Sequence, residues 1–226
     1  DMEGGIKDEA DLVARYRTMA LVPECDSAIE DIINESLASN DLDAPVSINL
    51  DRVNKIPEAT KKKIRIEFDE ILTLLGFRDL SHDIYRKWYV DGRLYYHKMV
   101  DKNSPKKGIQ GLRPIDPQKI RKIREVTKEK DEKTGVEIVG DVLEYYIFND
   151  EGFDKSGNNT GQTVRIHNDA VTHVTSGLLD YNKTVVVGYL HKALKPVNQL
   201  RMLEDALVIY RISRAPERRI FYIDVG

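Results

Sequence analysis

The sequence is poor in cysteine and has no long apolar run. It holds one cysteine, Cys25, in 226 residues, which excludes an internal disulfide and any zinc site built on several thiolates. A free thiol fits a reducing compartment. No stretch approaches the roughly 18 consecutive apolar residues of a membrane span, and residues 1–12 lack the basic and then apolar regions of a signal peptide. We therefore expect a soluble, unsecreted protein.

The motifs of common enzymes are also missing. The glycine spacing nearest to a phosphate-binding loop, at residues 157–163, has Gln162 where the phosphate-binding lysine would stand. Three histidines have no regular metal-ligand spacing and are expected to be surface or packing residues: His167, His173 and His191. The sequence therefore predicts a protein that is not an enzyme and uses no cofactor or metal.

The charges of the chain fall into blocks. The net charge is −3, with 35 Lys and Arg against 38 Asp and Glu. Residues 1–60 hold 5 basic and 14 acidic side chains, a net charge of −9, whereas residues 61–112 hold 12 and 7, a net charge of +5. A generic nucleic-acid-binding domain would be clearly basic. Alternating blocks indicate a protein with several distinct faces, and the alternative for each block is an ordinary solvated surface.

Two short helices are predicted near the start of the chain. They cover residues 10–21 and 25–39 and are separated by Pro23. Apolar residues recur in the second at three- and four-residue spacing. Asp26 or Ser27 can cap its start by accepting hydrogen bonds from free backbone N–H groups, and its acidic residues are expected to face water.

A strand and a longer helix follow. Apolar and polar residues alternate over residues 45–51, which predicts the strand. The helix has Pro57 near its first turn and Gly76 as its C-terminal cap. Its three lysines at residues 61–63 fit a solvated face better than a DNA site.

Aromatic residues are concentrated in the next part of the chain. A helix at residues 80–90, opened by Ser81, leads through a tight turn at Asp91 and Gly92 into a strand at residues 93–101. Four aromatic side chains are expected to form core or half-buried packing, with a base-stacking platform as the alternative: Trp88, Tyr89, Tyr95 and Tyr96.

Further strands are predicted in the middle of the chain. The prolines and glycines of residues 105–117 first indicate a loop-rich passage. Residues 120–127 and 141–150 then predict a long hairpin, and residues 163–169 and 171–177 predict two more strands.

The longest helical pattern lies at residues 189–214. Pro196 should kink or restart this helix, because its ring removes one backbone hydrogen bond. The apolar stripe is broad enough to imply burial on more than one side. Its central residues are Leu200, Leu203, Leu207 and Tyr210. Residues 217–226 have apolar side chains on both faces and predict a strand that needs partners from elsewhere.

Three runs of sequence carry a family resemblance: residues 88–101, 112–126 and 191–226. They resemble the portal vertex proteins of T-even-type tailed bacteriophages and their cyanophage relatives. The likeness extends from about residue 10 to the end of the chain, and the C-terminal run is its most specific part. The chain looks like the N-terminal half of such a portal.

The resemblance implies a subunit of a dodecameric ring at one vertex of the viral head. Such a ring serves DNA packaging and ejection, joins the head to the tail and nucleates head assembly. The implied fold is α+β, with residues 1–190 as a portal-like wing of small β-sheets and helices. Residues 191–216 would form the first stem helix, and residues 217–226 the first clip strand.

The resemblance also implies partners and a location. The expected partners are further copies of the chain, the large terminase subunit, neck or head-completion proteins, and major capsid and scaffold proteins. Double-stranded DNA would pass through the channel. The expected location is the capsid portal vertex of the virion, after assembly in the host cell, with the inner membrane as one place for that assembly.

Two sets of residues are expected to make contacts in such a ring. The basic candidates for contacts to neighbouring subunits, terminase or DNA are Lys192, Lys195, Arg201, Arg211, Arg214, Arg218 and Arg219. The candidates for packing between subunits are Leu200, Leu203, Leu207, Tyr210, Ile220 and Tyr222. The alternative for the basic set is ordinary solvated charge on a helix.

Two other functions stay open from the sequence. One is a different structural protein of a phage particle, such as an adaptor or baseplate component. The other is a nucleic-acid-binding enzyme whose catalytic half lies elsewhere. An acidic metal cluster or a phosphate loop encoded beyond Gly226 would favour the enzyme.

Overall fold

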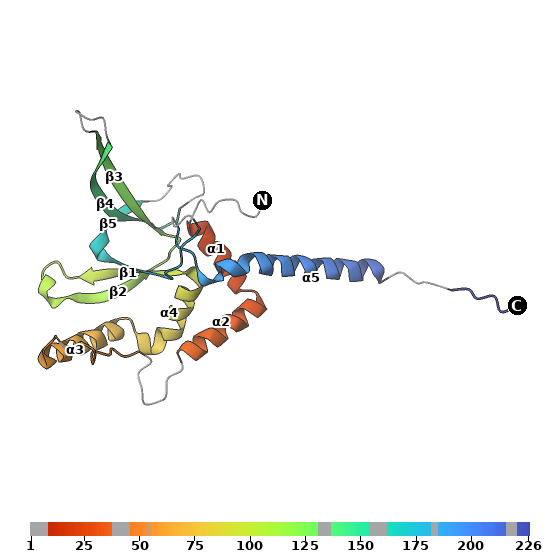
Figure 1. The fold of residues 1–226 in the computed structure, drawn as a ribbon, viewed down its shortest axis with the longest axis horizontal. Coiled ribbons are helices and arrows are strands. Elements are labelled where there is room, and N and C mark those ends of the chain that lie inside the picture. The colour runs from red at the N-terminus through yellow and green to blue at the C-terminus, as the bar shows by residue number, and fades with distance from the viewer. Residues whose placement is uncertain are drawn as a thin grey trace. The chain divides into compact units, whose positions relative to one another are not determined.

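The computed structural model divides the chain into two units. Unit 1 comprises Asp1–Tyr189 and unit 2 comprises Leu190–Gly226 (Figure 1). The structure describes residues 9–37, 46–53, 55–130, 137–153, 162–181, 185–215 and 221–226. Within these ranges, only the backbone is described for residues 127–130 and 137–141.

The described residues form five α-helices, six strands and three 3₁₀ helices. The α-helices are α1 (Glu9–Ala20), α2 (Pro23–Ser36), α3 (Glu58–Leu74), α4 (Phe77–Asp91) and α5 (Leu194–Arg214). The strands are β1 (Arg93–Val100), β2 (Ile109–Ile115), β3 (Ile120–Lys130), β4 (Glu137–Asn149), β5 (Thr163–His167) and β6 (Val171–Thr175). The 3₁₀ helices are η1 (Pro105–Lys107), η2 (Asn168–Ala170) and η3 (Tyr189–Ala193).

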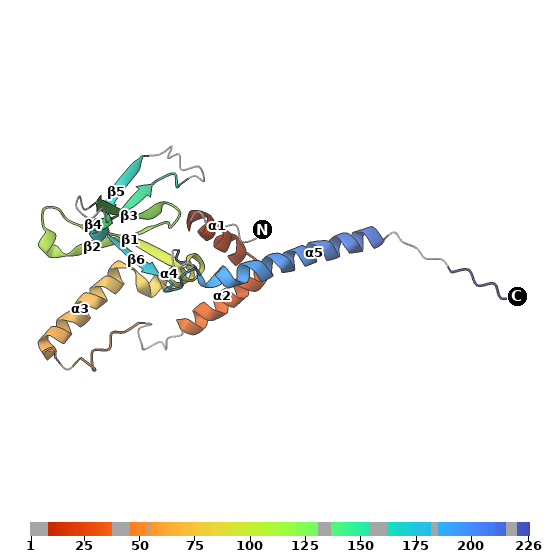
Figure 2. The same cartoon turned by 45° about the horizontal axis from the view of Figure 1, so that its top comes forward.

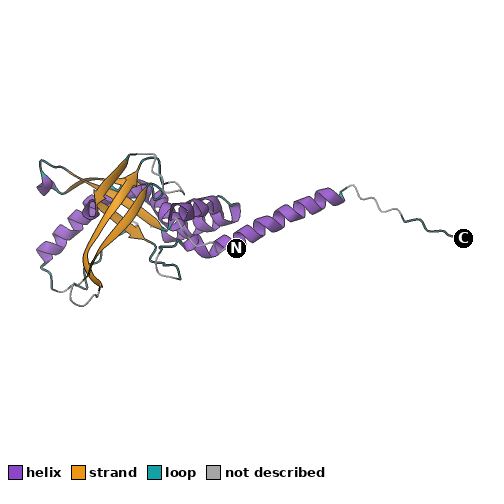
Figure 3. Cartoon of the chain, turned by 90° about the horizontal axis from the view of Figure 1, so that it is seen from above, coloured by secondary structure: helices purple, strands orange, loops and turns teal. Residues whose placement is uncertain are grey.

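Unit 1 contains two antiparallel sheets of three strands. Their strand orders are β2-β1-β6 and β3-β4-β5. The β2-β1-β6 sheet lies between the β3-β4-β5 sheet and helices α3 and α4 (Figure 1, Figure 2). From above, the strands of both sheets gather in one part of the unit, with helices beside them (Figure 3). The predicted α+β fold class is confirmed.

The strand predictions around the second sheet are largely confirmed. β3 and β4 form the expected hairpin and pair from Ile120 with Phe148 to Lys130 with Glu137, with a shift of register between Val126 and Lys128. Both strands extend further toward the hairpin end than the sequence predicted, and the loop at residues 131–136 lies outside the described residues. β5 and β6 also lie in the predicted segments.

Helices α1 and α2 each bury one apolar face. Val13 and Tyr16 of α1 and Ile29 and Ile33 of α2 are at most 1% exposed. Their spacing of three and four residues places each pair on one side of its helix. Burial of an aliphatic side chain of this size contributes about 1.5–3 kcal/mol relative to exposure, so these residues hold the first two helices in the unit.

The start of α2 differs from the prediction. Pro23 separates α1 from α2, as expected, but it is itself the first residue of α2. Its fixed φ suits that position, and its missing N–H removes no helical hydrogen bond there. Val22 precedes the helix and makes no side-chain cap. The predicted caps Asp26 and Ser27 are therefore wrong, because both lie inside the helix.

Some charged groups that were expected to face water are paired. Asp26 and Glu30 of α2 both accept hydrogen bonds from the guanidinium group of Arg86 on α4. The stem of Lys61 on α3 is buried, and its ammonium group lies 2.8 Å from a carboxylate oxygen of Glu58. The acidic face of α2 therefore helps to fix α4, and one of the three lysines of α3 is not part of a solvated face.

The strand predicted at residues 45–51 is wrong, because residues 46–51 form no strand. The side-chain oxygen of Asn49 accepts a hydrogen bond of 2.9 Å from the N–H group of Asp51. The N–H group of Val53 donates to the carbonyl of Leu50 at 3.1 Å. These local bonds compete with the ladder that a strand would need, and the segment turns instead of pairing.

Helices α3 and α4 meet at a single glycine. Gly76 ends α3 as predicted, and its φ of +58° is in the left-handed region that favours glycine. Phe77 is already the first residue of α4. The predicted start at residue 80, with Ser81 opening the helix, is therefore wrong, because the sharp turn at Gly76 leaves no loop between the helices.

Strand β2 lies in the passage at residues 105–117 that was predicted as loop-rich. Its partner is β1, with Pro114 opposite Tyr96 and Gly111 opposite Met99. β2 is at the edge of its sheet. A proline lacks the N–H group that a central strand would need, but an edge strand tolerates it. Proline and glycine therefore mark this edge instead of excluding a strand.

The predicted packing of the aromatic residues is confirmed. Tyr95 is 2% exposed, and its ring centroid lies 6.1 Å from that of Tyr146 on β4. The other three aromatic residues of the set are half-buried. Trp88 donates through Nε1 to a backbone carbonyl of β6, and Tyr89 stacks on Tyr189 with ring centroids 5.1 Å apart. These rings serve as packing between elements.

The tight turn after α4 is formed by Gly92 alone. Gly92 has a φ of +72°. Asp91 was expected to share the turn, but it is the last residue of α4 and is 2% exposed. Asp91 is therefore a buried charged residue with a structural partner, which is described below.

The segment at residues 185–189 is held against the start of β1. A Cβ atom on Gly92 would lie 2.6 Å from the Cα atom of Gly188, so the two backbones are in direct contact. The N–H group of Gly188 donates to the hydroxyl of Tyr16 at 3.2 Å. Arg93, which is 1% exposed, donates to the carbonyl of Val186. These contacts fix the end of unit 1, from which the chain continues into η3.

The C-terminal helix restarts at its proline, as expected. η3 ends at Ala193, and Pro196 lies in the first turn of α5, where its missing N–H group is tolerated. The strand predicted at residues 217–226 is not found in its described part, residues 221–226, and residues 216–220 lie outside the described residues. A strand needs a hydrogen-bonded neighbour, and none of the described residues pairs with this segment.

The contact between Gly92 and Gly188 predicts a large effect of a single methyl group. Gly92→Ala should destabilise unit 1 through the positive φ and through the clash with the Gly188 backbone. Gly177→Ala is the matched control, because Gly177 has a φ of +77° and no atom within 4 Å of its Cβ position.

We expect Gly177→Ala to cost about 1 kcal/mol for the positive φ alone. Gly92→Ala should cost about 1–3 kcal/mol more, because overpacking adds a penalty of that size. Urea unfolding followed by circular dichroism measures both. Equal losses of unfolding free energy would show that the Gly92–Gly188 contact does not constrain the fold.

Candidate interaction surface

Helix α5 is exposed along most of its length. Every residue from Asn198 to Ala215 is exposed. This includes large apolar side chains, with 68% exposure for Leu203, 60% for Leu207 and 67% for Ile209. A helix that is apolar on several sides is normally buried, and exposed apolar surface of this kind marks sites of association.

The apolar residues of α5 form two flanks. At about 100° per residue, the centres of the flanks lie about 120° apart around the helix axis. Flank A comprises Leu200, Leu203, Leu207 and Tyr210. Flank B comprises Met202, Ala206 and Ile209. The third side carries Arg201, Glu204 and Asp205 together with the apolar residues Val208 and Ile212. The two flanks adjoin and together cover about half of the helix circumference. One partner helix covers a narrower stripe, so an apolar surface this broad needs partners on two sides.

The basic candidates that the structure describes are spread along η3 and α5. Lys192, Lys195, Arg201, Arg211 and Arg214 are all exposed. The structure brings one of them against another candidate residue: the guanidinium carbon of Arg214 lies 4.4 Å from the centroid of the Tyr210 ring. Such a cation–π contact contributes about 0.5–1 kcal/mol at an exposed site. The others lie on different turns and sides of the helix and form no common cluster.

The remaining candidates belong to the C-terminal segment. Arg218, Arg219 and Ile220 lie outside the described residues. Tyr222 is described and is 92% exposed, and the neighbouring Phe221 is 82% exposed. The segment therefore presents aromatic side chains that nothing in the described part of the chain covers.

A charge cluster that the sequence analysis missed lies in unit 1. The guanidinium group of Arg17 on α1 donates two hydrogen bonds to Asp91 at 2.9 and 2.8 Å, and two to Asp116 at 3.2 and 3.0 Å. The side chain of Asp91 is 3% exposed, whereas those of Arg17 and Asp116 are 38% and 37% exposed. Arg17 thus joins α1, the end of α4 and the segment after β2.

The electrostatics of this cluster differ between its two carboxyl groups. Burial raises the pKa of Asp91 above its ordinary value despite the hydrogen bonds from Arg17. The hydrogen bond to Asp91 raises the pKa of Arg17 above its ordinary value. Burial raises the pKa of Asp116, but hydrogen bonds from Arg17 and from the N–H group of Gln118 outweigh this effect and hold that pKa below its usual value. No local signal in the sequence reveals the cluster, because Arg17 and Asp91 are 74 positions apart.

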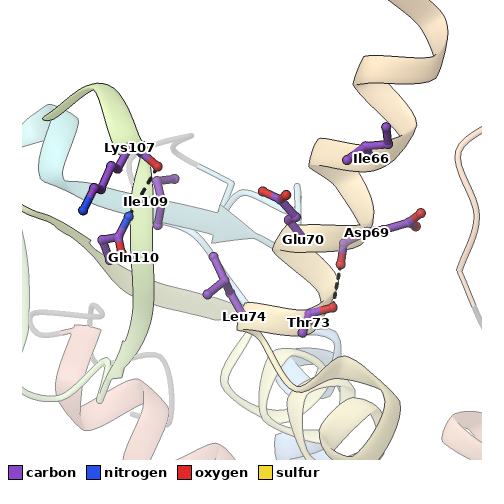
Figure 4. A pocket seen from close by; sticks show the side chains of 8 residues that line it. All are labelled: Ile66, Asp69, Glu70, Thr73, Leu74, Lys107, Ile109 and Gln110. Carbon is purple, nitrogen blue, oxygen red and sulfur yellow. Dashed lines mark hydrogen bonds between the residues drawn. The ribbon is translucent and has the colours of Figure 1, made fainter. Parts of the chain in front are cut away.

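An open groove of about 480 Å³ lies between α3 and β2. Ile66 and Leu74 of α3 and Ile109 of β2 contribute apolar surface, while Glu70 and Lys107 add opposite charges on its two sides (Figure 4).

Among the described residues, no group of three or more His, Cys, Asp or Glu side chains is arranged to hold a metal ion. No helix in the described part of the chain is long and apolar enough to cross a membrane.

Comparison with known proteins identifies the family. Residues 9–226 match the family described as "Bacteriophage T4-like portal protein (Gp20)". The chain belongs to this portal family. The resemblance seen in the three sequence runs is therefore confirmed.

Two relatives show how much of a portal protein the chain represents. The portal protein of Vibrio phage KVP40 is 43% identical over 223 residues, which cover 96% of this chain and 42% of that protein. The portal protein of Salmonella phage ViI is 34% identical over 225 residues, which cover 95% of this chain and 40% of that protein. The chain therefore spans about two fifths of the length of these portal relatives.

The cluster around Arg17 predicts that the stability of unit 1 in this portal family member depends on the positive charge of Arg17. Arg17→Met should cost about 3 kcal/mol of unfolding free energy, because it leaves the carboxylate of Asp91 buried and unpaired. Arg15→Met is the matched control: Arg15 pairs with Asp11 at 2.7 Å on the exposed side of the same helix. It should cost about 0.5 kcal/mol or less.

Adding Asp91→Asn to Arg17→Met should recover part of the loss, because the buried charge is then removed. Urea unfolding of the unmodified chain, Arg17→Met, Arg15→Met and the double variant Arg17→Met with Asp91→Asn measures these differences in unfolding free energy. A similar cost for Arg17→Met and Arg15→Met would contradict a structural role for the cluster.

Proposed function

We propose that the chain is part of a phage portal subunit that assembles with further copies into a ring-shaped channel at one capsid vertex. The channel would serve DNA packaging and ejection and join the head to the tail, and the ring would nucleate head assembly. Membership of the portal family supports this function. The observation in the chain itself that carries the proposal is the exposure of two apolar flanks on α5.

A ring explains why α5 has two flanks. In a closed ring, each subunit contacts a neighbour on either side through two different surfaces, so the interface is head-to-tail. For twelve copies, the directions to the two neighbours differ by about 150°, which is close to the about 120° between flanks A and B. Flank A of one copy would then pack against flank B of the next. A symmetric dimer would need only one such surface.

We assign the parts of the chain by this proposal. Residues 1–190 would form the wing, residues 191–216 the first stem helix and residues 217–226 the start of the clip. The division of the chain between Tyr189 and Leu190 supports the border between wing and stem. In the clip, Ile220 and Tyr222 would pack against neighbouring subunits, since a segment with apolar side chains on both faces needs partners on both.

The charge of the third side of α5 fits a channel wall. Arg201 is close in sequence to Glu204 and Asp205, so the side that faces neither neighbour has charges of both signs. Each phosphate contact adds affinity that must be lost again as DNA moves. A mixed surface would hold the duplex weakly, as a conduit requires. We propose no catalytic activity and no cofactor for this chain, since motor chemistry would come from terminase.

We propose further partners for the basic residues and a location for the protein. Beyond neighbouring subunits and DNA, the basic residues near the end of α5 would contact terminase or neck proteins: Arg211, Arg214, Arg218 and Arg219. The wing would face capsid and scaffold proteins. The protein would reside at the portal vertex of the virion.

The state of assembly tests the proposal directly. Native mass spectrometry and class averages of particles, on the protein in its full length, should give a closed ring of identical copies. A strictly monomeric full-length protein under all conditions would exclude the proposed function.

Two single substitutions test the head-to-tail packing of α5. Leu203→Glu on flank A and Ile209→Glu on flank B should each abolish ring formation, because an unpaired carboxylate buried in the contact costs about 3–5 kcal/mol. Both residues are exposed in the single chain, so the circular dichroism spectrum should be unchanged. Val208→Glu on the third side is the matched control and should assemble normally.

Mixing the two defective variants gives a sharper result. Leu203→Glu retains an intact flank B and Ile209→Glu retains an intact flank A, so one copy of each can form one contact. Native mass spectrometry of the mixture should therefore show heterodimers and no rings. Rings in the mixture, or loss of assembly in Val208→Glu, would contradict the proposed packing.

A further inference from the structure

His173 lies at the contact between the two sheets of unit 1. On β6 it is directly opposite Tyr95 of β1, and the two rings stack with centroids 4.3 Å apart and an angle of 16°. The Tyr146 ring from β4 lies roughly perpendicular to both rings of this stack, with its centroid 6.4 Å from that of His173, at an angle of 89°, and 6.1 Å from that of Tyr95. His173 therefore contacts aromatic rings from both sheets.

The side chain of His173 is poorly arranged for a positive charge. Its Nε2 atom is buried and has no hydrogen-bond partner among the described residues. A neutral imidazole tolerates this, because one of its nitrogens is only an acceptor, but both nitrogens of a protonated ring are donors. Protonation would therefore create a buried donor without an acceptor, which costs free energy.

The charged groups around His173 also disfavour protonation. By strand register, Arg93, Tyr95 and His97 of β1 and Arg113 of β2 lie on the same face of their sheet as His173. The face of the other sheet that carries Tyr146 also carries Lys122 and Arg124 of β3 and Glu144 of β4. The carboxylates near these cations are already paired, Glu9 with Arg93 and Glu144 with Lys122 at 2.7 Å. No carboxylate in the described part of the chain is hydrogen-bonded to the ring of His173.

We propose that His173 makes the contact between the two sheets sensitive to acid, so that protonation of its ring releases the β3-β4-β5 sheet from the β2-β1-β6 sheet. The same ring that stabilises the contact when neutral destabilises it when charged. The effect is local to unit 1 and does not depend on the proposed ring or on family membership.

The direction of the pH effect follows from the pKa of His173. Burial, helped by the nearby charges of Arg93 and Lys122, lowers this pKa from the usual 6.5 to about 4. Above pH 6.5 the ring is neutral in the folded and unfolded chain, and the stability does not depend on it. Between pH 6.5 and about 4 the unfolded chain binds the proton more readily, so stability falls as pH falls. The folding equilibrium constant changes by at most about tenfold per pH unit through this one group.

The test compares acid sensitivity with and without the ionisable ring. His173→Phe keeps an aromatic ring stacked on Tyr95 and beside Tyr146, and it removes the titrating nitrogen. Hydrogen exchange of the amides of β4 and β6, measured from pH 7 to 4, should show loss of protection at a lower pH in this variant than in the unmodified chain. His82→Gln is the control, because His82 is exposed on α4 and paired with Glu30. It should behave like the unmodified chain.

A second measurement decides the matter if His173→Phe does not fold. Titration of the five histidines by nuclear magnetic resonance should show the His173 ring charging well below pH 6.5, together with the loss of amide protection in β4 and β6. An unchanged acid response in folded His173→Phe would overturn the proposal. Titration of His173 near pH 6.5 with both sheets still protected would also overturn it.

Discussion

Helix α5 exposes large apolar side chains that no described part of the chain covers. Exposing this apolar surface to water is unfavourable, which is why we propose that further copies of the chain cover it. The contact between Gly92 and Gly188, the hydroxyl of Tyr16 and the guanidinium of Arg93 hold the segment that leads to η3. These contacts give unit 1 a defined end.

Polar contacts between distant parts of the chain hold the elements of unit 1 in defined positions. Arg17 meets Asp91 across 74 positions, and Gly188 meets Tyr16 across 172. Apolar packing alone tolerates small shifts between layers, but a bidentate ion pair or a backbone contact fixes both distance and direction. The buried polar groups of unit 1 therefore specify how its layers meet. His173 is an exception, because its unpaired nitrogen makes the contact between the sheets conditional on the charge of the ring.

Local signals made much of the fold predictable. Pro23, Gly76 and Pro196 mark helix borders because their backbone preferences act within one or two residues. The predictions are wrong where a contact between residues, and not the local sequence pattern, determines the structure. Residues 45–51 alternate like a strand, but Asn49 forms a local turn instead, and β2 was missed because only its edge position makes Pro114 acceptable. The role of Asp91 was hidden, since Arg17 is far away in sequence.

The same distinction separates the two sets of site residues. The apolar flanks of α5 were visible in the sequence because helix geometry turns spacing into direction. The spacing of the basic residues does not place them together on one side of the helix. Their positions on different sides of the helix say nothing of a partner, and Arg214 contacts Tyr210 of its own helix. An apolar side chain gains free energy from any complementary surface, whereas a charge gains it only from a specific one. Association can thus be inferred from one chain through its apolar residues, while the roles of its charges require the neighbour.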